Sequence, residues 1–141
     1  MATRVESCIF CKIIDDKAPS EKIYEDEYVT CIKDINPAST HHYLILPKRH
    51  IRNAKELKQE DAEIYDKMTC IVDRITEMQG LDAGCTLTGF HWPPFNTVHH
   101  LHLHVISPTN EINMWQRFMF RPDSFWFVST EYVRSYLQSR S

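Results

Sequence analysis

The sequence lacks long apolar runs and a strong excess of charge of either sign, and it contains only 3 glycines. No apolar run approaches the roughly 20 residues of a membrane-spanning helix. The N-terminal stretch MATRVESCIFCKII also has no apolar segment of signal-peptide length. We therefore expect a protein with no membrane partner. The net charge of −3 gives no broad electrostatic case for binding nucleic acid.

A disulfide framework is also missing. The chain has 5 cysteines, an odd number, and only Cys8 and Cys11 are close together. Together with the absence of a signal peptide, this favours free thiols or a metal site in an intracellular compartment.

Internal repeats, low-complexity segments and linkers are absent as well. A chain of 141 residues suits one domain with its own core. We therefore predict a single domain over residues 1–141.

Short strand-like stretches surround one clear helix. Apolar residues recur at helical spacing from Ile64 to Met78, and Gly80 marks the expected end of that helix. A second, short helix is expected after Ser129 or Thr130, either of which can cap it. Strands are expected in residues 22–34 as a hairpin, and in 42–47, 84–91 and 100–107. The pattern predicts an α+β fold with an antiparallel sheet.

The stretch HHLHLHVISP, residues 99–108, places three imidazoles on alternate residues. Because side chains alternate along a strand, these three share one face and the aliphatic residues between them share the other. His99 points with the aliphatic residues and is given no catalytic part. Three explanations fit the shared face: hydrogen-bonded structural histidines, a catalytic metal site, or a nucleophilic imidazole that attacks phosphorus. The residues concerned are His100, His102 and His104.

Other polar residues gather around this strand in the sequence. His42 begins one predicted strand, and His50 follows its end. The loop PPFNT comes directly before the histidine strand and offers backbone N–H groups together with the side chains of Asn96 and Thr97 to an anion. The aromatic-rich segment from Trp115 to Trp126 is interpreted as core or dimer contact.

HLHLHVI resembles the signature of the histidine triad (HIT) superfamily of nucleotide hydrolases and transferases. The resemblance extends to CIFCKIIDDKAPSEKIYEDEYV and KDINPASTHHYLILPKRHI, and so covers nearly the whole chain. Within the superfamily, GFHWPPF and SFWF are similar to the histidine triad nucleotide-binding protein 3 group, with aprataxin-like members next. The resemblance implies the HIT fold, with about five antiparallel strands, one long helix and a short C-terminal helix.

The resemblance also implies catalytic roles. His102 matches the nucleophile that attacks the α-phosphorus, and His104 matches the residue that contacts the phosphate oxygens. His100 matches the residue whose backbone carbonyl orients the His102 ring, and His42 matches a fourth histidine beside the triad.

Nucleotide-binding residues follow from the same resemblance. Asp34 matches the carboxylate that holds the ribose hydroxyls, with Ile35 beside the sugar. Asp34 also reads as a turn residue before Asn36. The expected adenine contacts are Phe10, Ile13 and Ile32, and the expected phosphate-loop residues are Phe95, Asn96 and Thr97.

The cysteine pair keeps three interpretations: two unpaired thiols, a redox pair, or part of a structural zinc site. Some superfamily members use CxxC, the histidine after the PK pair and the first triad histidine as zinc ligands. The matching residues here are Cys8, Cys11, His50 and His100. Catalysis itself is expected to require no cofactor.

The function implied is hydrolysis of adenosine 5'-monophosphoramidates and acyl-adenylates to AMP, through a nucleotidyl-histidine intermediate. The alternatives are an aprataxin-like deadenylase of nucleic-acid ends and a nucleotide-binding scaffold with little activity. The implied partners are adenosine nucleotide substrates and a second copy of the chain, and the implied location is the cytoplasm, with the nucleus as a further compartment.

Overall fold

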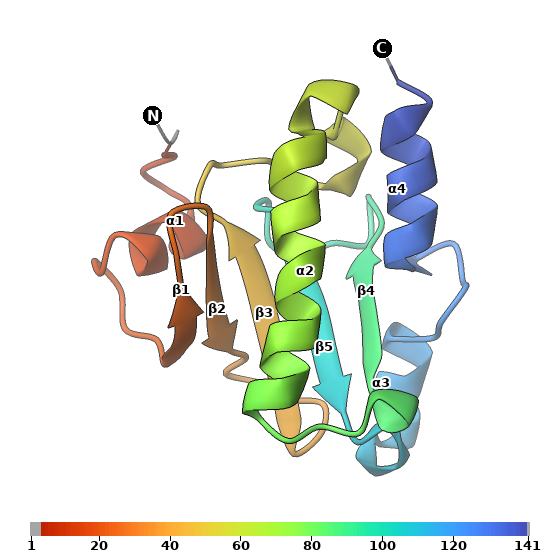
Figure 1. Cartoon of the computed structure of the whole chain (residues 1–141). Helices are drawn as coiled ribbons and strands as arrows, with labels where there is room; N and C mark the ends of the chain where they lie inside the picture. Colours follow the sequence, from red (N-terminus) through yellow and green to blue (C-terminus); the bar gives the residue numbers. More distant parts are fainter. Residues whose placement is uncertain (1–3, 141) are drawn as a thin grey trace.

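The computed structural model describes residues 4–140. Figure 1 shows the long helix α2 lying across a sheet, with α4 beside it. The α-helices are α1 (Ile9–Ile14), α2 (Ala62–Met78), α3 (Met114–Met119) and α4 (Thr130–Gln138). The strands are β1 (Lys22–Glu25), β2 (Val29–Lys33), β3 (His41–Pro47), β4 (Leu87–His91), β5 (Leu103–Ser107) and β6 (Phe127–Val128).

The six strands form one antiparallel sheet in the order β1-β2-β3-β5-β4-β6. The histidine-bearing strand β5 is therefore central, between β3 and β4. In the register of the β3–β5 pair, His42 lies opposite Ile106 and Leu44 lies opposite His104. This pairing brings residues from distant parts of the sequence to one face of the sheet.

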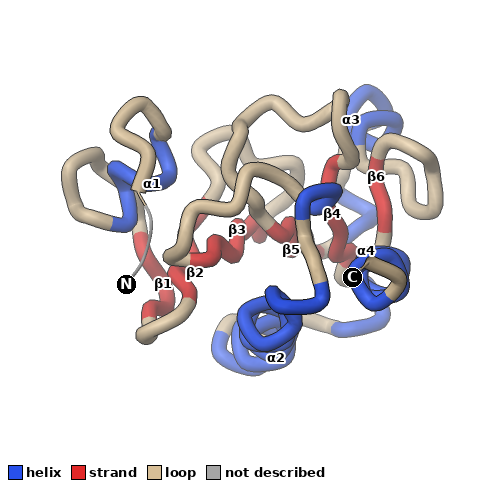
Figure 2. Tube along the Cα trace, turned by 90° about the horizontal axis from the view of Figure 1, so that it is seen from above, coloured by secondary structure: helices blue, strands red, loops and turns tan. Residues whose placement is uncertain are grey.

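The two faces of the sheet differ in what covers them. Figure 2 shows α2 and α4 on one side of the strands and α1 and α3 on the other. The α2 side holds the main apolar core, to which β5 contributes Leu103 and Val105. On the opposite side, α1 packs on Ile32 and Leu44, and Phe120 packs on Ile106. The triad histidines lie on this second face, between the two smaller apolar clusters.

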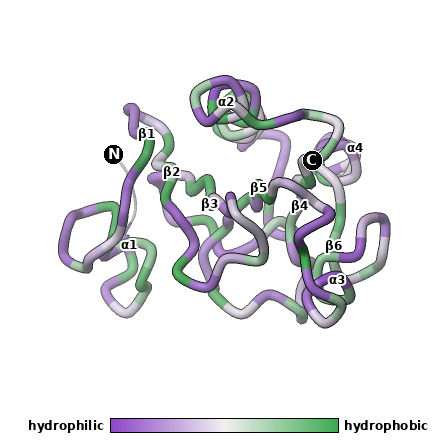
Figure 3. Tube along the Cα trace, turned by 90° about the horizontal axis from the view of Figure 1, so that it is seen from below, coloured by the Kyte–Doolittle hydropathy of each residue, from purple (hydrophilic) through white to green (hydrophobic). Residues whose placement is uncertain are grey.

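Helix α2 follows from its amphipathic pattern. Tyr65, Met68, Ile71 and Ile75 are buried, whereas most of the residues between them are polar. Figure 3 shows alternating hydrophilic and hydrophobic residues along this helix. Gly80, beyond its end, adopts a φ of 65°, a left-handed conformation that favours glycine. The predicted helix and its stop are confirmed.

Among the described residues, none of the helices combines the length and apolar character that crossing a bilayer demands.

The C-terminal helix is also confirmed, and Ser129 is its cap. The Ser129 side chain accepts a hydrogen bond from the backbone N–H of Tyr132.

Three expectations about the sheet and its histidine strand need correction. The histidine strand begins at Leu103, where its pairing with Ile45 of β3 ends, and residues 99–102 lie outside the ladder. There the Leu101 N–H donates to the Ile51 carbonyl at 2.6 Å. His99 is exposed and does not join the buried aliphatic residues. The sheet also has a sixth strand, β6, a two-residue strand too short to show any periodicity.

Candidate active site

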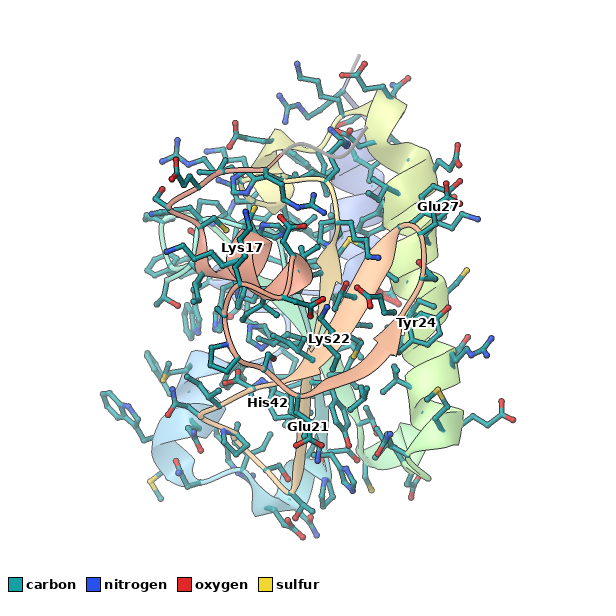
Figure 4. The ribbon with its side chains drawn as sticks, turned by 90° about the vertical axis from the view of Figure 1, so that its left-hand side faces the viewer. Lys17, Glu21, Lys22, Tyr24, Glu27 and His42 are labelled. Carbon is teal, nitrogen blue, oxygen red and sulfur yellow. The ribbon has the colours of Figure 1, made fainter. Side chains whose placement is uncertain are left out.

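Four buried histidines converge on the face of the sheet opposite α2. The exposed fractions are 3% for His42, 0% for His100, 9% for His102 and 5% for His104. Figure 4 views the molecule from the β1 side and shows His42 further inside than Lys22 and Tyr24 of that edge strand. Side chains continue to alternate before β5 begins, so His100 and His102 lie on the same face as His104 although the hydrogen-bonded strand starts only at Leu103. The predicted grouping of these four residues is present.

The backbone of His100 orients the His102 ring. His102 Nδ1 lies 2.7 Å from the His100 carbonyl oxygen. A carbonyl only accepts hydrogen bonds, so Nδ1 carries the proton and Nε2 carries the lone pair. In the described part of the chain, Nε2 has no hydrogen-bond partner. His102 therefore presents a fixed lone pair to the site.

A chain of hydrogen bonds fixes the tautomers of His42 and His104. The Ala38 N–H donates to His42 Nδ1 at 2.9 Å, so the proton of neutral His42 is on Nε2. His42 Nε2 lies 2.9 Å from His104 Nδ1, which must accept. The proton of His104 is then on Nε2. That atom is buried and, in residues 4–140, has no hydrogen-bond partner. A buried N–H donor without a partner is ready for an anionic ligand.

Burial keeps this group of imidazoles neutral. Desolvation lowers the pKa of His42 to about 4, although the carboxylate of Asp34, 3.3 Å away, opposes the shift. Desolvation likewise lowers the pKa of His102 and moves that of His104 well below its ordinary value. A neutral imidazole is nucleophilic, whereas an imidazolium is not.

The expected adenine contacts form a buried apolar wall beside the triad. Phe10, Ile13 and Ile32 belong to one cluster with α1 and the β2–β3 pair. The Phe10 ring meets the His102 ring edge-on, with centroids 5.2 Å apart. These side chains are also core residues, so they stabilise the packing of α1 on the sheet whether or not they contact an adenine.

Asp34 lies next to the imidazoles and also closes a turn. Its Oδ1 accepts from the Asn36 N–H at 2.8 Å, and its Oδ2 faces His42. Ile35 is 86% exposed beside it. One carboxylate oxygen therefore holds the turn while the other faces the site.

The loop before the triad is exposed. The Phe95 N–H donates to the Trp92 carbonyl, and the Phe95 ring meets Phe125 with centroids 6.0 Å apart. Thr97 is exposed, and Asn96 lines a small hollow that also contains His102. Asn96 thus lies close to His102, whereas the Phe95 backbone donor is already occupied.

A second cluster joins the N-terminal segment to the triad. Ligand atoms of Cys8, Cys11, His50 and His100 lie within 4.8 Å of one another. His100 Nε2 lies 2.9 Å from the Pro47 carbonyl, so Nδ1 carries the lone pair and faces both sulfurs. The two Nδ1 atoms of His50 and His100 are 3.1 Å apart, a separation that suits two ligands of one tetrahedral ion. The donor set fits zinc.

Sequence reasoning missed two residues of the site. The His91 ring meets the His104 ring at 5.1 Å, and its Nε2 lies 2.9 Å from the Met119 carbonyl. The Phe120 ring packs edge-on against His42 and His104. His91 stands in the quoted GFHWPPF motif, and its place at the end of β4 was the available signal. Phe120 sits after a six-residue helix that has no recognisable period.

Comparison with known proteins agrees with this geometry. A family model described as "Scavenger mRNA decapping enzyme C-term binding" matches residues 7–119. Adenosine 5'-monophosphoramidase HINT3 of Mus musculus is 36% identical over 130 residues, which cover 90% of this chain and 79% of that protein. Bifunctional adenosine 5'-phosphosulfate phosphorylase/adenylylsulfatase HINT4 of Arabidopsis thaliana is 38% identical over 109 residues, 76% of this chain and 74% of that protein.

Solved structures show the same fold. A HIT family hydrolase from Clostridium thermocellum superimposes with a TM-score of 0.69 at 39% identity, covering 72% of this chain and 90% of that one. A histidine triad protein from Clostridium difficile gives a TM-score of 0.71 at 28% identity, covering 74% of this chain and 92% of that one. The chain belongs to the histidine triad (HIT) superfamily of nucleotide hydrolases and transferases.

Proposed function

We propose that this protein hydrolyses adenosine 5'-monophosphoramidates and acyl-adenylates to AMP through a nucleotidyl-His102 intermediate. One observation carries the proposal: the Nδ1–H of His102 is held by the His100 carbonyl at 2.7 Å, which directs the Nε2 lone pair into the site. The name of the mouse relative, adenosine 5'-monophosphoramidase, supports the substrate class.

In the first step, Nε2 of His102 attacks the α-phosphorus and the bond to the leaving nitrogen or carboxylate oxygen breaks. Negative charge on the phosphoryl oxygens meets the Nε2–H of His104, the one donor whose position the Ala38–His42 chain fixes. His104 keeps this proton; the leaving group takes a proton from solvent, and the attacking water returns one to solvent in the second step. Asp34 holds the ribose hydroxyls, and Phe10, Ile13 and Ile32 surround the adenine.

In the second step, water attacks the phosphorus of the AMP–histidine and releases AMP. His102 regains its neutral state, which burial favours because it lowers the pKa of this imidazole. The residues of the site perform both steps without a metal at the phosphorus.

Replacement of His102 by Ala tests the proposal. We expect no turnover of an AMP–amine substrate, with AMP affinity retained, because the adenine and ribose contacts are unchanged. The matched control is His41→Ala, which removes an imidazole of β3 whose Nδ1 contacts the Tyr43 hydroxyl, away from the triad. Turnover by the His102→Ala variant at the wild-type rate would contradict the proposal.

We also propose that Cys8, Cys11, His50 and His100 hold a structural zinc ion. The support is the convergence of two thiols and two imidazoles described above. When bound, the ion would join α1 to the segment before β5 and to the chain after β3.

A homodimer is the proposed assembly. Several large apolar side chains are exposed on and near α3, an arrangement that is common in surfaces that bind protein partners. Light scattering on the purified protein tests it, and a monomer mass at micromolar concentration would contradict it.

A further inference from the structure

Two hollows meet at Arg52. The smaller one runs beside the nucleophile and is lined by Arg52, His102, Asn96 and His91, among others. The larger one has a volume of about 440 Å³ and lies beside the same loop. Its lining includes Arg52, Thr97, His99 and His50. Arg52 and Val98 line both hollows, so this arginine stands where the larger pocket adjoins the nucleophile.

The Arg52 guanidinium has no counter-charge. In the described residues it makes no hydrogen bond and no ion pair, whereas Arg49 pairs with Asp61 and Arg134 pairs with Asp66. None of the residues lining either hollow is acidic. The acidic residue nearest in sequence, Glu56, accepts a hydrogen bond from Asn53 at 3.4 Å. The two hollows therefore present beside the site a positive charge that has no ion-pair partner in residues 4–140. The Glu56 carboxylate is nevertheless close to the larger hollow, because burial lowers the pKa of His50 there and Glu56 opposes that shift.

Arg52 also lies in a different part of the site from Asp34. A row of contacts joins Asp34 to His42, His42 to His104, His104 to His102, His102 to the His100 carbonyl, and His100 to His50. Asp34 is the proposed ribose ligand at one end of this row. Arg52 shares a hollow with His102, whereas Asp34 lines neither hollow. Arg52 and Asp34 therefore serve different parts of a substrate whose phosphorus lies at His102.

We propose that Arg52 and its adjoining pocket bind a negatively charged tail on the leaving group, specifically the carboxylate of an aminoacyl-type amine joined to AMP. A guanidinium presents paired N–H donors that match a carboxylate. This inference rests on the proposed function, because it concerns the leaving group of that reaction. It identifies Arg52 as a specificity-determining residue and gives it no part in bond breaking.

The test compares two substrates that differ only in charge: the AMP phosphoramidates of 6-aminohexanoate and of 6-aminohexanamide. In the wild-type protein, we expect kcat/KM to favour the carboxylate about two- to fivefold at low salt, mainly through KM, as for an exposed ion pair. The preference should shrink as salt rises. Arg52→Gln should lose it, and Arg52→Lys should keep part of it.

Lys55→Gln is the matched control. It removes one positive charge, as Arg52→Gln does, from an exposed residue that lines neither hollow. This variant should retain the wild-type preference. Equal kcat/KM values of the wild type for the two substrates, or an unchanged preference in Arg52→Gln, would overturn the inference.

Calorimetric binding of both compounds to the His102→Ala variant gives the same comparison without chemistry. We expect the His102→Ala variant to bind the 6-aminohexanoate compound more tightly than the amide, and the double variant with Arg52→Gln to bind the two equally. This result supports the inference whether or not the wild-type protein turns over either substrate. Absence of turnover by the wild type would contradict only the proposed function, whereas equal binding of the two compounds contradicts the role of Arg52.

Discussion

Replacing His42 with Ala removes the middle of the hydrogen-bond chain that fixes His104. The Ala38 N–H and His104 Nδ1, each 2.9 Å from a His42 nitrogen, both lose their partners. An unsatisfied buried polar group costs about 1–3 kcal/mol, so with two such groups the free energy of unfolding should fall by roughly 2–6 kcal/mol. His104 is then free to place its proton on Nδ1. We expect kcat to fall roughly 10- to 100-fold, which corresponds to losing about 1.5–3 kcal/mol of phosphoryl stabilisation.

The assay is single-turnover hydrolysis of an AMP–amine substrate, combined with ¹⁵N NMR of the histidine tautomers. His41→Ala is the control, because His41 is the neighbouring residue on β3 and its Nδ1 bonds the Tyr43 hydroxyl, away from the triad, at 2.6 Å. We expect this variant to keep the wild-type kcat. A His42→Ala variant with an unchanged kcat and His104 still protonated on Nε2 would refute the reasoning.

Three further predictions test other parts of the site. The folded pKa of His42, at about 4, is below the ordinary value of 6.5, so the unfolded chain binds more protons between these values. The urea midpoint of unfolding should therefore fall as pH drops from about 6.5 to 4. His42→Ala should reduce this dependence of the midpoint on pH, and an equal dependence in the two proteins would contradict the lowered pKa of His42. Purified protein should contain one zinc per chain by elemental analysis. Cys11→Ser should lose this zinc, whereas Cys70→Ser, a change at an exposed cysteine, should keep it. A full equivalent of zinc in Cys11→Ser would exclude the proposed zinc site. Asp34→Asn should raise KM about five- to tenfold for an adenosine phosphoramidate but not for its 2',3'-dideoxy analogue, as expected from losing a charged hydrogen bond to the ribose; an equal rise for both would remove the ribose contact.

The long helix and the β1–β2 hairpin at the edge of the sheet could be predicted because their signals are local. Helix α2 has an apolar stripe at helical spacing, and a charged turn separates β1 from β2. The start of β5 could not be predicted in this way. Alternation continues from His100 to Ser107, but pairing with β3 stops at Leu103 although β3 runs on to Pro47, because the Leu101 N–H donates to the Ile51 carbonyl beyond that strand instead.

The candidate site was predictable for residues within recognisable motifs, and much less so for the rest. Alternation along the sequence identifies His100, His102 and His104 as candidates, and a matching motif identifies His42. Phe120 reaches the site only through tertiary packing, from a segment whose neighbours Trp115 and Phe118 remain 74% and 59% exposed. The segment from Trp115 to Trp126 thus contributes both to the site and to an exposed apolar surface.

The central claim is that His102 becomes covalently nucleotidylated. Acid-quenched protein, mixed with an AMP–amine substrate for a fraction of one turnover, should yield a peptide carrying AMP on His102 by mass spectrometry. The adduct should be absent from the His102→Ala variant and should accumulate when water attack is slowed. AMP attached to another histidine, or substrate turnover with no adduct at any time, would contradict the account.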